Sequence, residues 1–586
     1  MLNGRLYRLS WLVAALALLV ALLTLESPGG TPPPPLPPAF DAVAARGISV
    51  DLAAIAPDRA PGTPGDLASA QWVAGQLGAV PGATAVRRQR FSVMTSGARV
   101  VTENVYVSLP ARSGSAAAAA LVISAPRDTP PGVKGGESGT AVLVQLARSL
   151  GTVARNRSVL LVSTGASTLG NAGARWLVSR FSGTPIAAAL SLDDPAGVPG
   201  GLQIWDDGQD GRRSIAMASA AEQAAARADA PLAPPPGPFP QLAGMAVPQT
   251  SGDQAAYIAA GIPSVSLASR PESPLAGGDP ATEDALGDAG RTAETLLSSL
   301  DAADAPASPA AGVVINGREL RPVMSRVVIL LLVLPILVAG LDLVVRLRRA
   351  GVRLMPFIAA LLWRLLPVVV AILVAHLLAT AGMLAPPSGG WPPLPAQVPF
   401  DLAAVVAVLL SVGAAVLTWV VVRHRAMRRN AEVASRAAAG VIALGVVCVL
   451  LWLATPFGLL IALPAAHAAL VATRARKPWH VVALALVSAV PAVLVVWWAS
   501  SRIDRGIPYS AWYLIETTAS GARGIIGPVL ATAVLVIVWS LGSLVMSRVR
   551  RGLVAAGPYR PVPTDDERMA RRGRKRRGTP VGGGDA

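Results

Sequence analysis

The chain has 586 residues, of which 53% are hydrophobic, and its mean hydropathy of +0.52 is too high for an ordinary soluble protein. Its formal net charge is +17, yet the segment from Glu26 to Arg321 carries 25 acidic and 21 basic residues, so the positive excess lies elsewhere. Because that excess stands in short segments beside hydrophobic runs, it indicates membrane orientation and excludes a nucleic-acid-binding interpretation. The single cysteine, Cys448, excludes a framework of disulfides.

The first expected element is a membrane anchor. Arg5 and Arg8 precede an apolar stretch from Trp11 to Leu25, which is the pattern of a signal peptide or a signal anchor. The residues that follow lack a small-x-small cleavage pattern, so an uncleaved anchor is predicted. The proline-rich stretch from Thr31 to Pro38 is then expected to be a stiff polyproline spacer that holds the next domain off the membrane surface.

Short apolar runs alternate with helical stretches from Phe40 to about Leu300. This alternation predicts an α/β domain with a mostly parallel sheet flanked by helices. In such a sheet, functional groups gather in loops beyond the carboxyl ends of the strands. The expected strands are 121–124, 158–163 and 187–192, and the expected helices are 139–150 and 172–181.

From Val323 onward the chain contains apolar runs long enough to cross a bilayer, which takes about 20 residues. Arginine-rich segments follow the first, third, fifth and seventh runs, whereas the segments between the others are less basic. This asymmetry predicts a multi-pass protein of the plasma membrane, with both termini cytoplasmic and the Glu26–Arg321 domain outside. With the anchor, eight spans are expected. The seven runs are 323–345, 365–384, 402–422, 437–453, 457–473, 481–500 and 525–545, and 501–524 is expected to be an aromatic-rich loop.

These patterns divide the chain into seven parts. They are a cytoplasmic N-terminus (1–10), a transmembrane signal anchor (11–25), a proline-rich linker (26–40), an extracytoplasmic α/β domain (41–300), a second linker (301–322), an all-α region of seven spans (323–547) and a basic, disordered cytoplasmic tail (548–586). The tail carries a basic cluster from Arg571 to Arg577. Because the tail leaves a membrane span, anionic lipid headgroups are its expected partner.

Several motifs in the α/β segment resemble those of M28-family zinc peptidases. The segment from Ala60 to Pro64 opens the match, and the segments from Ser251 to Gln254 and from Ala260 to Pro263 close it. Segments at 124–139, 163–174 and 190–193 fit between them in order. The match covers about residues 41–297, and with the membrane spans the chain resembles the membrane-bound branch typified by endoplasmic-reticulum metallopeptidases. The resemblance implies an aminopeptidase-type fold.

The resemblance also implies a metal site, whose ligands are mostly missing from this sequence. Active members of the family hold two zinc ions with two histidines, a bridging aspartate, a glutamate and a second aspartate, and another glutamate is their general base. All four histidines of this chain, at 376, 424, 467 and 480, lie beyond the α/β segment. Only Asp193 matches a ligand position. The other positions fall on Pro126, Gly135, about Thr164 and Gly165 for the paired glutamates, and Gln254.

A zinc centre is therefore not expected, and no catalytic residue is assigned. The predicted cleft-lining residues are Asp128, Glu137, Asp193, Asp253 and Gln254. The acidic residues of this set, together with Asp194, offer oxygen ligands for a hard cation such as calcium, and the alternative is that they cap helices and loops. Ser138 and Lys134 offer a serine nucleophile with a lysine base, and the alternative is a solvated lysine in a loop.

Within the apolar runs, the polar candidates are His376 and His467. Ionisable groups inside a membrane are costly and often functional, and the alternative is a neutral histidine that hydrogen-bonds a neighbouring helix. Asp342 and Arg346 stand four residues apart and are expected to pair locally.

Three hypotheses for function follow from these patterns. The first is a catalytically inactive pseudopeptidase whose outer domain binds a peptide or protein without a cofactor. The second is an active zinc-dependent aminopeptidase, for which zinc is the cofactor. The third places transport, lipid handling or assembly in the membrane bundle, with the outer domain as a regulator. In all three the lipid bilayer is a partner and nucleic acid is not.

Overall fold

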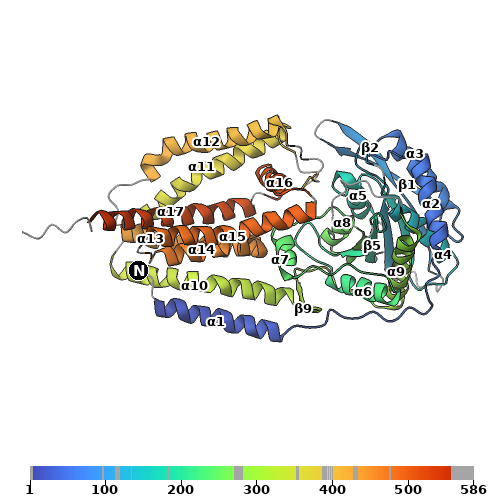
Figure 1. Ribbon diagram of the computed structural model, residues 1–586, viewed down its shortest axis with the longest axis horizontal. Helices are drawn as coiled ribbons and strands as arrows, with labels where there is room; N and C mark the ends of the chain where they lie inside the picture. The colour runs from blue at the N-terminus through green and yellow to red at the C-terminus, as the bar shows by residue number, and fades with distance from the viewer. Residues whose placement is uncertain are drawn as a thin grey trace, which may run out of the picture.

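The computed structural model consists of an α/β domain at one end and a bundle of long helices at the other (Figure 1). It describes residues 4–555 except 96–97, 112–118, 134, 182–184, 199–200, 270–280, 352–354, 386–391, 394, 396–397, 399, 427–432, 474, 476, 504 and 525. The basic cluster of the predicted tail and Lys134 lie outside the described residues. The predicted fold class, an α/β domain joined to an all-α bundle, is confirmed.

The α/β domain is built on a seven-stranded sheet in the order β1-β2-β4-β3-β5-β7-β6. Its four middle strands are parallel, as the strand–helix alternation predicts, whereas β1, β2 and β6 join by antiparallel pairing and make the whole sheet mixed. The strands are β1 (Arg87–Met94), β2 (Arg99–Leu109), β3 (Ala120–Pro126), β4 (Val159–Thr164), β5 (Ile186–Asp193), β6 (Gln203–Trp205) and β7 (Ser264–Ala268).

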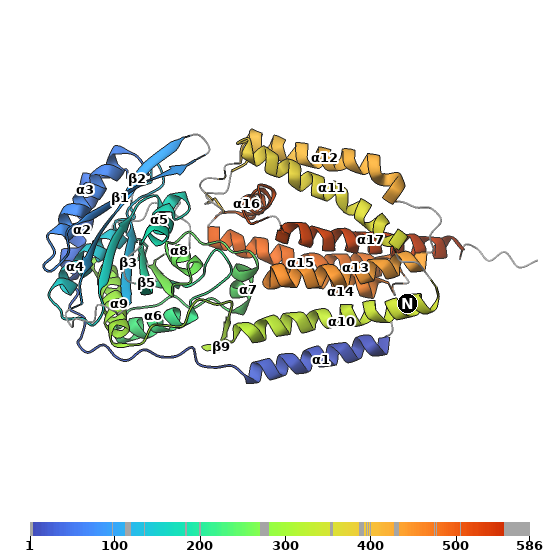
Figure 2. The same cartoon turned by 180° about the vertical axis from the view of Figure 1, so that it is seen from behind.

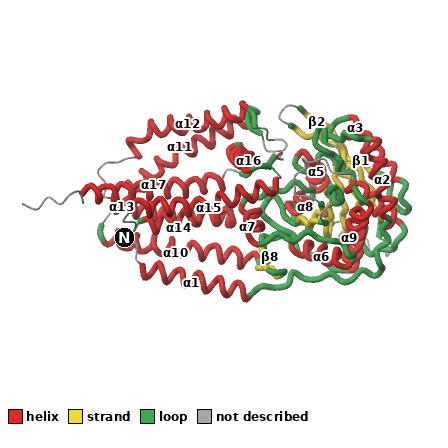
Figure 3. Tube along the Cα trace, in the orientation of Figure 1, coloured by secondary structure: helices red, strands yellow, loops and turns green. Residues whose placement is uncertain are grey.

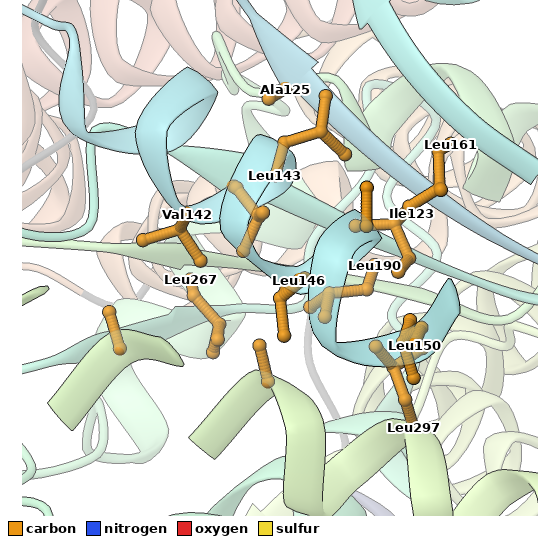
Figure 4. Packing of buried hydrophobic residues seen from close by; sticks show 14 of the residues in the cluster. Ile123, Ala125, Val142, Leu143, Leu146, Leu150, Leu161, Leu190, Leu267 and Leu297 are labelled. Carbon is orange, nitrogen blue, oxygen red and sulfur yellow. The ribbon is translucent and has the colours of Figure 1, made fainter. Parts of the chain in front are cut away.

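Helices cover both faces of this sheet, which is why its middle strands are apolar on both sides. On one face, Ile123, Leu161 and Leu190 pack under α4 and α9 (Figure 4). On the other face, Val122 and Val162 share a buried cluster with residues of α5 and α8. The helices and the 3-10 helix of the domain are α2 (Ala42–Ile55), α3 (Pro64–Gly78), α4 (Ser138–Gly151), η1 (Ser167–Leu169), α5 (Ala172–Arg180), α6 (Ile215–Arg227), α7 (Pro238–Ala246), α8 (Gln254–Ala259) and α9 (Glu283–Ala302).

The first turn of α4 lies directly against the end of β5, and only glycine fits there. A Cβ atom at Gly139 would stand 2.1 Å from the carbonyl oxygen of Leu192. Backbone on both sides leaves neither group free to move aside. The close approach therefore fixes where α4 begins and how the loop before it meets the sheet.

We predict that Gly139→Ala destabilises the α/β domain by about 3 kcal/mol or more, because the new methyl group overlaps backbone. The control is Gly75→Ala in α3, where nothing lies within 4 Å of the added atom, and where a gain of about 0.5–1 kcal/mol is expected. Pulse proteolysis of the full chain in detergent measures both. Equal effects of the two substitutions would contradict the close approach.

Within the described residues, seven helices are long and apolar enough to cross a membrane. They are α1 (Gly4–Leu23), α10 (Pro322–Arg349), α11 (Met355–Thr380), α12 (Leu402–Ala426), α13 (Val433–Ala454), α15 (Pro478–Ile503) and α17 (Ile526–Ala555). A further apolar helix, α14 (Pro456–Ala472), has 17 residues. The expected count of eight spans therefore depends on whether α14 crosses the bilayer as well, and it stays a prediction.

The predicted anchor is a full member of the bundle. Figures 1 and 2 both show α1 lying along α10. The polypeptide leaving α1 also pairs with the segment entering α10, since the backbone N–H groups of Glu26 and Glu319 each donate to the other residue's carbonyl. Arg321 adds an ion pair with Glu26. The predicted pair of Asp342 and Arg346 is confirmed at 2.9 Å.

Three connections differ from the sequence expectations. The proline-rich stretch is not a spacer, because Arg227 and Gln223 of α6 bind its backbone at Thr31 and fasten it along the domain. The predicted second linker contains a hairpin of β8 (Val313–Ile315) and β9 (Arg318–Leu320). The predicted aromatic-rich loop contains a helix, α16 (Ile507–Ala519), which Figure 3 shows between the bundle and the α/β domain.

The α/β domain sits directly on the bundle through α7. Ala243 belongs to one buried cluster with Trp498 of α15 and Tyr513 of α16, and Met245 belongs to another with residues of α13 and α14. Two arginines add polar contacts: Arg502 at the end of α15 pairs with Asp207 at 2.6 Å, and Arg523 donates to the carbonyl of Pro248 at 2.7 Å. The domain and the bundle are thus joined by side chains as well as by the chain itself.

We predict that Arg502→Ala loosens this junction by about 1–2 kcal/mol, because the carboxylate of Asp207 is left partly buried without its cation. Hydrogen–deuterium exchange of α7 should then speed up by as much as about tenfold. The charge-exchanged double variant Arg502→Asp with Asp207→Arg tests the pairing itself and should restore slow exchange. Unchanged exchange in the single variant would show that the junction holds without the Arg502–Asp207 pair.

Candidate functional site

The predicted site residues lie at one edge of the sheet, where the parallel strands end. β3 ends at Pro126, two residues before Asp128, and β4 and β5 end at Thr164 and Asp193. Asp253 directly precedes α8, whose last turn leads into β7. This is the edge at which α/β sheets present their functional loops.

Two buried carboxylates hold the loop that follows β4. Asp253 accepts hydrogen bonds from the hydroxyls of Thr164 at 2.5 Å and Ser167 at 2.9 Å. Asp128 accepts from the backbone N–H groups of Ser167 and Thr168, both at 2.9 Å, and from the Thr168 hydroxyl at 2.6 Å. Both oxygens of each carboxylate therefore already have donors from the protein.

Burial raises the pKa of both carboxyl groups. The pKa of Asp253 rises from 3.8 to about 6, chiefly through burial, with a further contribution from the nearby charge of Asp128, although the hydroxyls of Thr164 and Ser167 lower it. The pKa of Asp128 is also raised by burial, against the hydrogen bonds from Thr168 and Ser167. Asp253 consequently exchanges its proton in the mildly acidic range.

We predict that the domain loses stability as the pH rises from about 4 to about 6, because a raised pKa means that the folded state holds the proton more tightly than the unfolded chain. The change expected from the shift is about 3 kcal/mol. Asp253→Asn should flatten this part of the profile, because the amide keeps the shape without titrating. Pulse proteolysis across this range measures the slope, and the same slope in the variant would assign it to another group.

Arg59 is fully buried and organises the loop between β3 and α4. Its guanidinium donates to the carbonyls of Ala56 and Arg127 at 2.9 and 2.8 Å and to the carbonyl of Gly135 at 2.5 Å, and it pairs with Glu137 at 3.0 Å. Gly135 is the position at which the family resemblance implies a bridging aspartate. Its φ of 102° is one that residues other than glycine rarely adopt. A cation of the protein therefore binds the segment that would have to carry a metal ligand.

Arg127 is buried beside Gly165, onto which one of the paired glutamates of the resembled family falls. It forms a fully buried ion pair with Asp66 at 2.9 Å and donates to the carbonyl of Glu103 at 2.6 Å. A Cβ atom at Gly165 would stand 2.8 Å from Nη2 of Arg127 and 2.6 Å from the hydroxyl of Thr102. Position 165, onto which one of the paired glutamates falls, thus has no room for a side chain.

Asp193 and Gln254 both lie beside Gly252, where their side chains approach the same point. A Cβ atom at Gly252 would stand 3.2 Å from Oδ2 of Asp193 and 2.0 Å from Oε1 of Gln254. Gln254 donates through Nε2 to the hydroxyl of Thr250 at 2.9 Å. Asp193, which alone matches a ligand position of the resembled family, therefore has an amide and no imidazole as its neighbour at this glycine.

The calcium and serine-nucleophile alternatives find no geometric support among the described residues. No group of three or more His, Cys, Asp or Glu side chains within the described ranges is placed to hold a metal ion. Asp194 accepts from Ser138 at 2.6 Å, and Glu137 pairs with Arg59 instead of turning to the other carboxylates. Ser138 is thus engaged with an aspartate, and its proposed partner Lys134 lies outside the described residues.

The dizinc donor set does not fit this edge of the sheet. Pro126 and Gly135 offer no side-chain donor, and both oxygens of Asp128 and of Asp253 accept from protein groups. Zinc in proteins takes imidazole, thiolate or carboxylate ligands in a compact set. Asp193 with an amide neighbour does not make such a set. No metal-dependent step is therefore derived for this site.

The structure brings together part of the predicted set and adds residues that the sequence did not single out. Asp128 and Asp253 meet through the loop after β4, Asp193 and Gln254 lie together beside Gly252, and Glu137 stands apart with Arg59. The additions are Arg59, Arg127 and Ser167. Arg127 follows Pro126, a lost ligand position, and an arginine at that place was the signal that the sequence offered.

The two histidines of the bundle are hydrogen-bonded to neighbouring segments. The ring of His467 in α14 contacts the carbonyl of Leu332 at 3.0 Å through Nε2 and the hydroxyl of Tyr7 at 3.3 Å through Nδ1. His376 contacts the carbonyl of Ser520 at 3.1 Å through Nδ1. His467 therefore joins α1, α10 and α14, and this geometry favours the structural alternative for it.

Comparison with known proteins gives fold likeness alone. No protein-family model and no curated protein matches the chain. Similar solved structures include a zinc aminopeptidase from Bacillus subtilis (14% identity, 46% of this chain and 98% of that chain, TM-score 0.37), an aminopeptidase from Aneurinibacillus sp. strain AM-1 (13%, 46% and 95%, 0.36) and a glutaminyl cyclase from an Acidobacteriales bacterium (17%, 45% and 97%, 0.36). At TM-scores below 0.5 this likeness assigns no role to any residue.

Proposed function

We propose that the protein is a membrane-anchored pseudopeptidase, in which the α/β domain binds a peptide or protein and does not hydrolyse it. The observation that carries the proposal is the state of the carboxyl edge of the sheet. Two ligand positions of the resembled family lack a donor, a third has no room for a side chain, and the buried carboxylates of Asp128 and Asp253 are bound by hydroxyl and backbone donors.

Two buried arginines set this edge of the sheet apart from a metal site that merely lacks one ligand. A single missing ligand leaves a weakened metal site, whereas here Arg59 and Arg127 use the buried space and bind the surrounding loops. Buried guanidinium groups with several acceptors are expensive to remove. The arrangement is therefore a stable alternative to a metal centre, and it keeps the loops that form the family's cleft in place.

The proposed location is the plasma membrane, with the α/β domain outside and the C-terminal tail in the cytoplasm. Its support is the distribution of charge along the bundle. Arg346, Arg348 and Arg349 close α10 at the end of the bundle away from the α/β domain (Figure 1). Basic residues gather on the cytoplasmic side of membrane proteins.

The decisive experiment measures metal and hydrolysis together on the full chain purified in detergent. We expect less than about 0.1 zinc per chain after dialysis against micromolar zinc, and no turnover of an aminoacyl reporter or of a peptide with N-terminal glutamine. The matched variant is Asp193→Ala, which removes the one retained ligand and should leave the metal content unchanged. Near-stoichiometric zinc that is lost in this variant, together with hydrolysis, would establish the active aminopeptidase instead.

Binding is tested separately, with fluorescent peptide pools and the same two proteins. Saturable binding that is weakened by Asp193→Ala places the ligand at the carboxyl edge of the sheet. If no pool binds while deletion of bundle helices abolishes the cellular phenotype, the function lies in the bundle and the pseudopeptidase proposal fails.

A further inference from the structure

The hairpin of β1 and β2 extends from the outer edge of the sheet toward the helix bundle. Figures 1 and 2 show it from opposite sides, and in both views the two strands run toward the ends of α11 and α12. β1 ends at Met94 and β2 begins at Arg99, so these residues stand at the end of the hairpin nearest the bundle. Met94 is 70% exposed.

The two faces of this hairpin differ sharply. Met94 pairs with Arg99 and Ser92 pairs with Val101, so these four side chains share one face. Val101 is 53% exposed, and Arg99 is exposed as well. On the opposite face Phe91 is buried and stacks on Trp176, with ring centroids 5.7 Å apart. The hairpin is thus anchored to the domain by one face and presents methionine, valine and arginine on the other.

Basic residues continue along the same face away from the turn. Arg88 and Arg90 both pair with the buried Glu103, and the Arg90 side chain is 75% exposed. Charged side chains on an edge strand oppose pairing with a strand of another protein. Apolar tips flanked by arginine suit the boundary between lipid headgroups and acyl chains, where the arginines stay with the phosphates.

The junction between the α/β domain and the bundle fixes where this hairpin stands relative to the ends of the bundle helices. Through α7 and the Arg502–Asp207 pair, the domain is held against the ends of the same helices that are apolar enough to cross a bilayer. The end of the hairpin that carries Met94 and Arg99 is therefore the part of β1 and β2 nearest to the level at which a bilayer around the bundle would end. Lipid headgroups are present at this level wherever the chain is embedded in a bilayer.

We propose that the exposed face of the β1–β2 hairpin at its bundle end is a lipid-binding surface: Met94 and Val101 enter the headgroup region of the leaflet next to the α/β domain, and Arg99 and Arg90 bind anionic phosphates there. This contact gives the domain a second attachment to the membrane besides α7. It sits on the opposite side of the domain from the strap formed by the proline-rich stretch.

Depth-dependent quenching tests the contact on the full chain. In a Cys448→Ala background, which removes the only cysteine, Met94→Cys is labelled with nitrobenzoxadiazole and reconstituted into nanodiscs of phosphatidylcholine and phosphatidylglycerol in a three-to-one ratio. Headgroup-spin-labelled lipid should quench this probe about twofold. Val43→Cys on α2, which is also exposed (64%) but far from the bundle, is the matched control and should be quenched little.

A third probe separates this proposal from the membrane placement on which it rests. Leu535→Cys lies on an exposed part of α17 and should be quenched by lipid labelled deep in the acyl chain. With that quenching in place, equal quenching at positions 94 and 43 overturns the lipid contact. A probe at position 94 that is shielded from water yet not quenched by lipid shows a protein partner instead, and this result also overturns it. We expect Arg99→Glu to reduce the quenching of the probe at position 94 by headgroup-labelled lipid.

Discussion

The buried ion pair between Arg127 and Asp66 is the interaction on which the carboxyl edge of the sheet depends. Both side chains are fully buried, and the arginine also binds the carbonyl of Glu103 in β2. Removing one partner of such a pair typically costs about 3–5 kcal/mol, because the other charge is left without compensation. Through Arg127 the loop after β3 is tied to α3 and to β2 at once. Arg59 extends the same principle to the next loop, where it binds Gly135 and Glu137.

This network explains why the domain can keep its loops in order without metal ligands. A metal centre holds loops by drawing several donors to one point. Here the donors are spread out, with two arginines, two buried aspartates and the hydroxyls of Thr164 and Ser167 each joining a pair of segments. The result is an edge whose polar groups are engaged with one another.

Much of the architecture could be predicted from sequence because its cause is local. The strands predicted at 121–124 and 187–192 fall within β3 and β5, and the one predicted at 158–163 matches β4 with a shift of one residue. The β8–β9 hairpin also had a local signal, since Asn316 and Gly317, both with positive φ, form the turn between two short strands. The ion pair of Arg127 with Asp66 had no local signal, because the two residues are far apart in sequence and charged residues are usually exposed. The docking of α7 on the bundle is equally non-local.

The pairing of Glu26 with Glu319 has a consequence for the fate of the domain. The exit of α1 and the entry of α10 lie side by side, so the α/β domain is a loop whose two ends enter the bundle together. A single proteolytic cut within that loop leaves both pieces attached to helices. Release of the domain from the bundle therefore requires two cuts, one on each side. A domain attached in this way is harder to shed than one that hangs from a single helix.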